Sequence, residues 1–318
     1  MDVEPVRVVP RLVERVWGRR DLGPWYADLL KPHGLVVGEA WLTDTDCEVE
    51  EGGTLGDLIG RNGSRLLGDG AGQRPILAKM LFTAATLSVQ VHPTDAAARS
   101  AGIAATGKNE AWHILEADAD AAVWVGFLEP VTPARLRKAV TEGSIMGLLR
   151  RRQARPGDTV LVPAGTVHTI GTGLVLLEVQ DPVDVTYRLF DFGRPRPLQV
   201  EEALAVADLG AAQAQAQDGT AMSAPVDGHV LARAPRFVAE RHEVGGGLAV
   251  QPDGARYHIL VPLAPGVLLD GRELGPGAAA LVPAHGRAAV LTGAERAPVA
   301  VLHPGPEPTS CLTKQPSG

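Results

Sequence analysis

An approximate internal repeat is the feature of this sequence that most restricts its fold. The segment GDTVLVPAGTVHTIGTG at Gly157–Gly173 aligns without gaps with GAAALVPAHGRAAVLTG at Gly277–Gly293. Upstream, GKNEAWHIL ending at Leu115 aligns with DGARYHIL ending at Leu260, in the same order along the chain. Both halves are therefore expected to contain the same strand–turn–strand unit. A length of 318 residues is that of about two ordinary domains.

Between frequent turns, the chain consists of short apolar segments that often alternate with polar residues. Its 37 Gly and 25 Pro supply the turns, and this pattern favours a sandwich or barrel of short strands. Strands are predicted at Leu35–Leu42, Thr86–His92, Glu110–Glu116, Ala121–Gly126, Thr159–Val162, Val175–Gln180, Arg256–Leu260, Gly266–Leu269, Ala278–Val282, Ala288–Leu291 and Val299–Leu302. Helices are predicted at Thr54–Leu67, Thr132–Arg150 and Val200–Leu209, and a linker at Gly210–Asp227.

Composition excludes several classes of protein. The net charge of −7 does not suit a nucleic-acid binder, because phosphate backbones are bound by concentrated Lys and Arg. A phosphorylated small molecule needs only a few local cations. The two cysteines, Cys47 and Cys311, form no Cys-x-x-Cys pair, which argues against a disulfide framework or a thiolate zinc finger. No apolar run approaches the ~18 residues of a membrane span, and no secretory leader is recognisable. We expect a cytoplasmic protein.

The repeat also indicates where the chemistry lies. In the alignment, Glu110 corresponds to Ala255 and His168 to Ala288, while Lys108 corresponds to Asp253. Apolar and turn positions persist between the copies, whereas these ionisable ones do not. The alignment therefore predicts a functional site in the first copy only.

Four residues of the first copy form a candidate metal site. Side chains of a strand alternate between its faces, so Gln90 and His92 of LSVQVH project together. Taken alone, such a pair is more often an ordinary solvated face. Glu110 begins a later strand, and His168 follows a Pro-Ala-Gly turn. Histidine and carboxylate ligands suit zinc and similar metals, to which Gln90 can add an amide oxygen.

In its order of motifs the chain resembles the short bacterial form of type I mannose-6-phosphate isomerases, which belong to the cupin superfamily. The resemblance rests on VWG (Val16–Gly18), GEAW (Gly38–Trp41), LSVQVHP (Leu87–Pro93), GKNE (Gly107–Glu110), LVPAGTVHTIG (Leu161–Gly171), and LEVQ followed by VTYRLFDFGR (Leu177–Arg194). It implies a mainly β bicupin: two cupin-type β-barrel or jelly-roll domains with a few added helices. Residues 1–210 would form the catalytic metal-binding domain and residues 211–318 a degenerate cupin-like domain.

The same resemblance implies the chemistry. Gln90, His92, Glu110 and His168 would hold one Zn²⁺ per chain, and Lys108 and Arg188 would line the substrate pocket as catalytic residues. The implied reaction interconverts mannose 6-phosphate and fructose 6-phosphate through a cis-enediol. The expected partner is a small sugar phosphate, with no nucleic acid and no membrane, and the chain is expected to be a monomer or a homodimer.

Two departures from the family pattern concern the sugar more than the metal. Thr83 and Leu42 stand where relatives usually carry acidic residues, which leaves an isomerase for another sugar or sugar phosphate as an alternative. Lys79 either reaches the pocket or covers apolar surface with its stem. A metal-dependent oxygenase also uses two His and a carboxylate, but Gln90 and Lys108 argue against it. A non-catalytic sugar-binding cupin is the other alternative.

Overall fold

The structure is a computed structural model that describes residues 3–26, 34–68, 74–211, 229–293, 296–305 and 311–314. The chain divides into two compact units. One comprises Met1–Arg15, Arg20–Met80 and Ala224–Gly318, and the other comprises Val16–Arg19 and Leu81–Ser223. N-terminal segments thus group with the C-terminal part of the chain. The domain boundary at residue 210, which the resemblance implied, stays a prediction.

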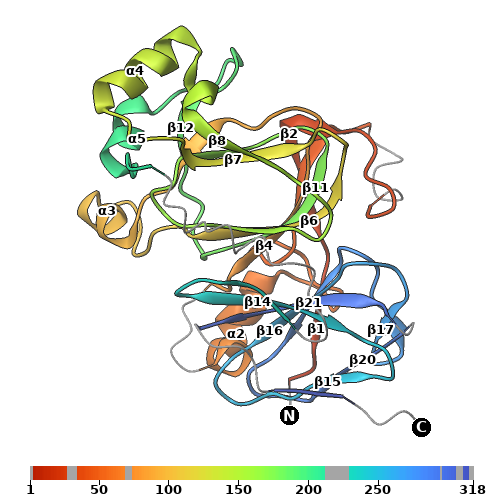
Figure 1. The fold of residues 1–318 in the computed structure, drawn as a ribbon. Helices are drawn as coiled ribbons and strands as arrows, with labels where there is room; N and C mark the ends of the chain where they lie inside the picture. Colours follow the sequence, from red (N-terminus) through yellow and green to blue (C-terminus); the bar gives the residue numbers. More distant parts are fainter. Residues whose placement is uncertain are drawn as a thin grey trace. The chain divides into compact units, whose positions relative to one another are not determined.

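Antiparallel strands are the predominant secondary structure of the described residues, as predicted. Two sheets are built from β1 (Val6–Val8), β13 (His229–Arg233), β14 (Phe237–Glu243), β15 (Leu248–Val250), β16 (His258–Pro262), β17 (Val267–Leu269), β18 (Arg272–Glu273), β19 (Ala279–Val282), β20 (Ala289–Gly293), β21 (Pro298–Pro304) and β22 (Leu312–Lys314). Their strand orders are β1-β19-β16-β21-β14-β13 and β18-β17-β20-β15-β22. These strands lie in two layers in Figure 1.

The other two sheets carry the candidate site. Their strands are β2 (Arg11–Arg19), β3 (Val37–Trp41), β4 (Leu77–Phe82), β5 (Val89–Val91), β6 (Glu110–Ala117), β7 (Ala122–Phe127), β8 (Leu149–Gln153), β9 (Thr159–Val162), β10 (His168–Ile170), β11 (Leu174–Gln180) and β12 (Tyr187–Phe190). The strand orders are β12-β5-β10-β7-β8 and β2-β3-β4-β11-β6-β9. Between β6, β9 and β11 on one side and β7 and β10 on the other lies a buried apolar core that includes Trp112, Val123 and Leu176. The fold class predicted from the sequence is confirmed.

Short helices connect the strands: α2 (Leu55–Leu67), α3 (Asp95–Ser100), α4 (Pro133–Glu142), the 3-10 helix η1 (Ile145–Leu148) and α5 (Val200–Val206). Helix α2 begins after a capping threonine, Thr54. Thr54 accepts from the backbone N–H of Asp57, whose carboxylate accepts in turn from the Thr54 N–H. This reciprocal pair satisfies two N–H groups that a helix terminus otherwise leaves unpaired.

One predicted helix is wrong. The segment Thr132–Arg150 is not a single helix, because α4 ends where Gly143 takes a left-handed conformation with φ of 73°. Glycine adopts that conformation without the cost a side chain would impose. The residues beyond it form η1 and then β8, an edge strand paired with β7. Nearly all of the predicted linker Gly210–Asp227 lies outside the described residues.

In the earlier half of the repeat, strand pairing gives a different alignment from the one predicted from the sequence. The later half of the repeat is confirmed, since β9 and β19 occupy corresponding positions of the gapless alignment. In the earlier half, Glu110 lies opposite Val162, whereas His258 lies opposite the corresponding Val282. The residue equivalent to Glu110 is therefore His258, and the expected equivalence with Ala255 is wrong by three positions. The second copy thus retains an ionisable group at this place.

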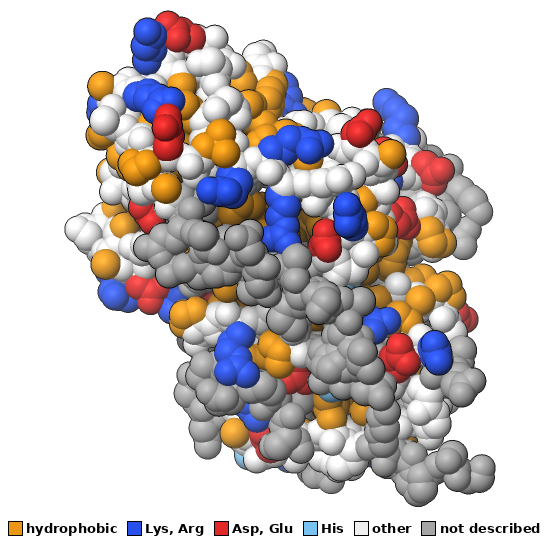
Figure 2. All heavy atoms as spheres, viewed as in Figure 1, with side chains coloured by type: hydrophobic (Ala, Val, Ile, Leu, Met, Phe, Trp, Pro, Cys, Tyr) orange, Lys and Arg blue, Asp and Glu red, His pale blue; other side chains and the backbone are white. Residues whose placement is uncertain are grey.

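Charges of both signs are mixed on the face of the molecule drawn in Figure 2. On the face drawn in Figure 2, Lys and Arg side chains alternate with Asp and Glu among the coloured residues, and no broad basic area is visible there. Within the part of the chain that the structure describes, no helix is long and apolar enough to cross a membrane.

Candidate metal centre

Three predicted site residues form one row across the sheet with strand order β12-β5-β10-β7-β8. Gln90 of β5 lies directly opposite His168 of β10 on one side and Arg188 of β12 on the other. Residues that face each other across antiparallel strands project from the same face of the sheet. His92 follows two positions after Gln90, directly after the last residue of β5, and alternation gives it the same face.

Glu110 enters the site from the facing sheet. It is the first residue of β6, where it lies between Val162 of β9 and Gln180 of β11. The loop before it is tightly fixed. A side chain at Gly107 would come within 2.4 Å of the Pro93 carbonyl. Asn109 donates from its backbone and its amide to buried Asp181, at 2.9 and 2.8 Å. This loop holds Lys108 and Glu110 in place.

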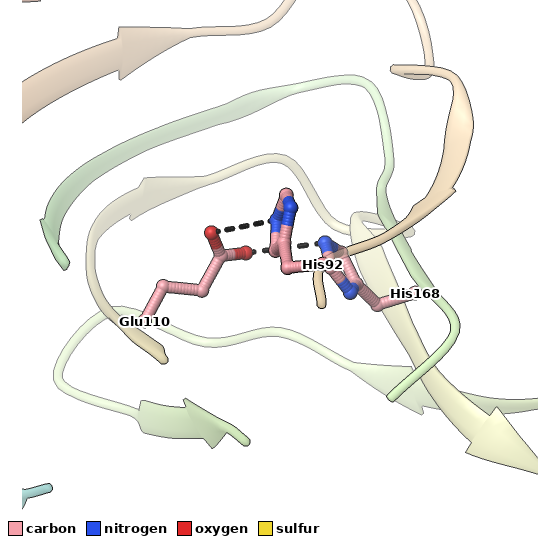
Figure 3. A group of neighbouring side chains, drawn as sticks. All are labelled: His92, Glu110 and His168. Carbon is pink, nitrogen blue, oxygen red and sulfur yellow. Dashed lines mark ion pairs between the residues drawn. The ribbon is translucent and has the colours of Figure 1, made fainter. Parts of the chain in front are cut away.

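Figure 3 shows the carboxylate of Glu110 with one oxygen directed at each histidine. Glu110 Oε2 lies 3.0 Å from His92 Nε2, and Oε1 lies 3.2 Å from His168 Nε2. All three side chains are buried, and their ligand atoms lie within 4.8 Å of one another. Among the described residues, no other group of three or more His, Cys, Asp or Glu side chains was found to bring its ligand atoms together in this way.

The hydrogen bonds of the two histidines fix where their lone pairs point. His92 Nδ1 lies 2.9 Å from the Val185 carbonyl, and His168 Nδ1 lies 2.8 Å from the Thr166 carbonyl. A carbonyl oxygen only accepts, so each Nδ1 carries the proton and the neutral ring turns a lone pair at Nε2 toward Glu110. Two imidazole lone pairs then face a carboxylate, and His92 Nε2 makes no hydrogen bond. Such an arrangement is stabilised by a cation between these atoms, and the residues therefore fit a metal ion.

The electrostatics of the group agree with neutral histidine and ionised glutamate. Burial, helped by nearby Lys108, lowers the pKa of His92 to about 4, although Glu110 opposes the shift. Burial alone would raise the pKa of the Glu110 carboxyl. His92, Lys108 and His168 outweigh that effect and hold this pKa well below its ordinary range. Near pH 7 the centre thus presents the Glu110 carboxylate and the neutral imidazole of His92, which are the protonation states that bind metals.

Gln90 stands at the edge of the centre. Its amide nitrogen lies 3.3 Å from His168 Nε2, and its amide oxygen accepts from Ser88. The two ends of an amide are nearly equal in shape, so a half-turn about the last side-chain bond would bring the oxygen to the metal position. Ser88 could then accept from the amide nitrogen. Gln90 therefore completes the set as a fourth ligand only after this turn.

Lys108 is buried beside the centre and surrounded by carboxylates. Its Nζ lies 3.3 Å from Glu110 Oε2 and 3.6 Å from Asp184 Oδ1. Burial favours the neutral amine, but the charges of Glu110, Glu178 and Asp184 dominate and raise the pKa of Lys108 above its ordinary value. Lys108 carries a proton in this environment.

Two residues near the centre were missed in the sequence. Glu178 is buried on β11 opposite Trp112, and Asp184 follows in the loop before β12. Both act on the charge of Lys108. Alternation along LEVQ places Glu178 on the same face as Gln180, which lies opposite Glu110, and this was the signal available. Asp184, Gln90 and Arg188 are partly exposed, so solvent reaches the centre beside them.

Two of the departures from the family pattern prove to be structural. The hydroxyl of Thr83 donates to the Gly171 carbonyl at 2.8 Å and accepts from the Leu174 N–H at 2.9 Å. It is fully buried and satisfied by backbone groups. Leu42 is likewise fully buried. Lys79 is also buried, and its Nζ lies 4.6 Å from the ring centroid of Trp41, close enough for a cation–π interaction.

Comparison with known proteins identifies the family. No family model matches the chain. Over 224 residues it is 33% identical to the mannose-6-phosphate isomerase ManA of Bacillus subtilis (strain 168), a match that covers 66% of this chain and 70% of the relative. The chain belongs to the mannose-6-phosphate isomerase family. A mannose-6-phosphate isomerase of Streptococcus mutans is 27% identical over 289 residues, or 85% of this chain and 88% of that one.

Solved structures of the same family share the fold. The mannose 6-phosphate isomerase of Bacillus subtilis superposes with a TM-score of 0.76 at 24% identity, over 94% of this chain and 99% of that one. A zinc-bound mannose 6-phosphate isomerase gives a TM-score of 0.74 at 18% identity, over 95% and 100% of the two chains. At these identities the likeness concerns the fold, while the family rests on the sequence relatives.

Proposed function

We propose that this chain is a zinc-dependent isomerase that interconverts mannose 6-phosphate and fructose 6-phosphate. The observation that carries the proposal is the buried His92–Glu110–His168 group, whose lone pairs converge on one point beside a protonated lysine. Membership of the mannose-6-phosphate isomerase family supports the substrate pair. A related structure that holds zinc supports the choice of metal.

The reaction moves a proton between C1 and C2 of the sugar, through an enediol. When bound, zinc would act as a Lewis acid that polarises the sugar carbonyl and orients its oxygens. The protein holds it with Gln90, His92, Glu110 and His168. Arg188, which stands in the same row as Gln90 and His168, would stabilise negative charge on an enediolate oxygen.

Lys108 is placed to supply a proton. Because three carboxylates keep its ammonium charged, Lys108 serves as a general acid toward a sugar oxygen in the aldose-to-ketose direction. In the ketose-to-aldose direction, the neutral amine of Lys108 accepts the proton back from the same sugar oxygen. The carboxylate of Asp184, 3.6 Å from Nζ, holds the ammonium in place from the exposed side.

Two arginines that follow β12 and share one carboxylate suit the phosphate. Arg194 and Arg196 both bind the buried carboxylate of Asp191, at 2.7 and 2.6 Å. Burial lowers the pKa of Arg188, and the charges of Arg196 and Arg194 add to this shift. Two guanidinium groups on one carboxylate leave an excess of positive charge, which attracts a phosphate dianion.

Arg196→Gln is expected to raise the KM for mannose 6-phosphate roughly tenfold with little change in kcat, because a hydrogen bond to a charged group contributes about 1.5–3 kcal/mol. Arg194 still binds Asp191 in this variant. Steady-state kinetics measure the effect, and Arg150→Gln, on exposed β8, is the matched control. An unchanged KM would remove Arg196 from the phosphate site.

The proposed function is tested with a coupled assay for fructose 6-phosphate formed from mannose 6-phosphate. We expect turnover by zinc-loaded protein, its loss after treatment with a chelator, and its return when zinc is added back. Folded, metal-replete protein without turnover would exclude this substrate pair and favour another sugar. We further propose that the protein acts in the cytoplasm. We also propose that it is a monomer or homodimer, and gel filtration with light scattering would test this oligomeric state.

A further inference from the structure

A hydrogen-bonded pair, Asn109 and Asp181, joins three segments of the unit that carries the metal centre. The amide nitrogen of Asn109 donates to Asp181 Oδ2 at 2.8 Å, and its backbone N–H donates to the same oxygen at 2.9 Å. The backbone N–H of Asp181 donates in return to the Asn109 carbonyl at 3.0 Å. The amide oxygen of Asn109 accepts from the Ala164 N–H at 3.1 Å. Because a carboxylate only accepts and a backbone N–H only donates, these partners settle which way the amide points.

The first joined segment carries Lys108 and Glu110, one on either side of Asn109. Both side chains are buried, and Lys108 Nζ lies 3.3 Å from Glu110 Oε2. Asn109 is held through its backbone N–H, its backbone carbonyl and both ends of its amide. A shift of this residue would therefore displace the proton donor and a metal ligand together.

The second joined segment is the turn that contains Ala164, and it contacts both histidines of the centre. The Gly165 N–H donates to the His92 carbonyl at 2.8 Å. The Thr166 carbonyl accepts from His168 Nδ1 at 2.8 Å. A displacement of this turn would therefore disturb the hydrogen bond that orients one imidazole and the backbone that carries the other.

The third joined segment begins with Asp181, directly after β11. Further along it, the Val185 carbonyl lies 2.9 Å from His92 Nδ1, and Asp184 Oδ1 lies 3.6 Å from Lys108 Nζ. Asp181 is 0% exposed, so bulk water does not replace the hydrogen bonds that its partner makes. The supports of the metal ligands and of the proton donor thus meet at one hydrogen-bonded pair.

We propose that Asn109 and Asp181 are positioning residues, which set the geometry of the metal ligands and of Lys108 while standing outside the ligand set. Loss of a group that holds metal ligands in place typically lowers metal affinity or activity about 10–100-fold. Misplacement of a reacting group by about 1 Å can cost ~10²-fold in rate. The effect on zinc binding stands by itself, whereas the effect on turnover rests on the proposed function.

Asn109→Ala removes both hydrogen bonds of the amide and leaves those of the backbone. We expect its zinc affinity and its kcat to fall about tenfold, with KM within about twofold. Calorimetric titration of metal-free protein measures the affinity, and kcat is measured on zinc-saturated protein. The matched control, Thr132→Ala, removes a hydrogen bond to the Arg135 N–H at the start of α4 and should lower only the melting temperature. If Asn109→Ala likewise changed only the melting temperature, the proposal would be overturned.

A double variant separates positioning from a general loss of stability. Asn109→Asp alone sets two carboxylates against each other and should lower zinc affinity and kcat at least as much as Asn109→Ala. Adding Asp181→Asn exchanges the two groups. The new aspartate then accepts from the Ala164 N–H and from the new amide, whose oxygen accepts from the backbone N–H of residue 109. Both quantities should return to within about threefold of the unaltered chain.

Circular dichroism establishes that each variant is folded. If Asn109→Asp does not fold, the double variant is compared with Asn109→Ala instead. A double variant that binds zinc no better than the single variant would overturn the proposal. Lack of turnover by the unaltered chain would contradict the proposed function alone, because zinc affinity would still decide the positioning role.

Discussion

His168→Ala is expected to lower isomerase activity roughly a thousandfold and to remove the metal of the centre. His168 Nε2 is one of the three converging ligand atoms, and Nδ1 is already held by the Thr166 carbonyl. A Lewis acid contributes several kcal/mol to such a reaction, and each 1.36 kcal/mol is a factor of ten in rate. Steady-state kinetics on zinc-equilibrated protein measure the loss.

The control for this variant is His285→Ala. His285 is exposed and stands in the second copy, so both activity and metal content should match those of the unaltered chain. Circular dichroism on metal-free samples shows whether His168→Ala remains folded. A folded His168→Ala protein with normal turnover would remove His168 from the centre, and with it the argument from converging lone pairs.

Much of this centre was predictable because strands alternate. Gln90 and His92 lie two positions apart on one strand, and that spacing alone gives them a common face. The spacing of residues did not predict that β5 and β6, which lie in facing sheets, bring their side chains together. That depends on which sheet packs against which, and the prediction came from the family resemblance. Glu178 was missed because a single carboxylate in an apolar strand does not mark a site by itself, although its alternation with Gln180 places both on one face.

The earlier half of the repeat shows that matching similar residues in two segments can give the wrong structural alignment. The sequence matched His113 with His258 through the shared His-Ile-Leu, but pairing in the sheets places Glu110 and His258 in equivalent positions. An odd shift along a strand reverses every side chain. His113 therefore meets Thr159, its partner across β9, while His258 turns toward the core of its unit. The register follows from which side chains are buried in the folded sheets, and the sequence of a short apolar segment does not show which face will be buried.

The helix predicted at Thr132–Arg150 failed for a related reason. Arg150–Arg152 on β8 are good helix formers, and nothing in their own sequence marks a strand. Their conformation is set by pairing with β7, which is distant in the chain. Gly143 was the local signal that the helix ends.

Lys108→Met is expected to lower kcat by about 10²–10⁴-fold, the range typical of losing a general acid. Methionine has nearly the length of the lysine stem and cannot donate a proton. The variant also leaves Glu110 without the ammonium 3.3 Å away, although both histidines remain to face its oxygens. Zinc should therefore still bind, so a large loss of kcat with metal present would assign the effect to proton transfer.

The matched control is Lys138→Met on helix α4, where the lysine is exposed and pairs only with Glu142 at 3.8 Å among the described residues. Its kcat should equal that of the unaltered chain. Activity and bound zinc are measured on the same preparations, because the two readouts separate the roles. If Lys108→Met lost both zinc and activity, Lys108 would be a support of the metal centre. If it kept both, proton transfer would have to come from another group, with Glu178 and Asp184 the nearest carboxylates acting on that lysine.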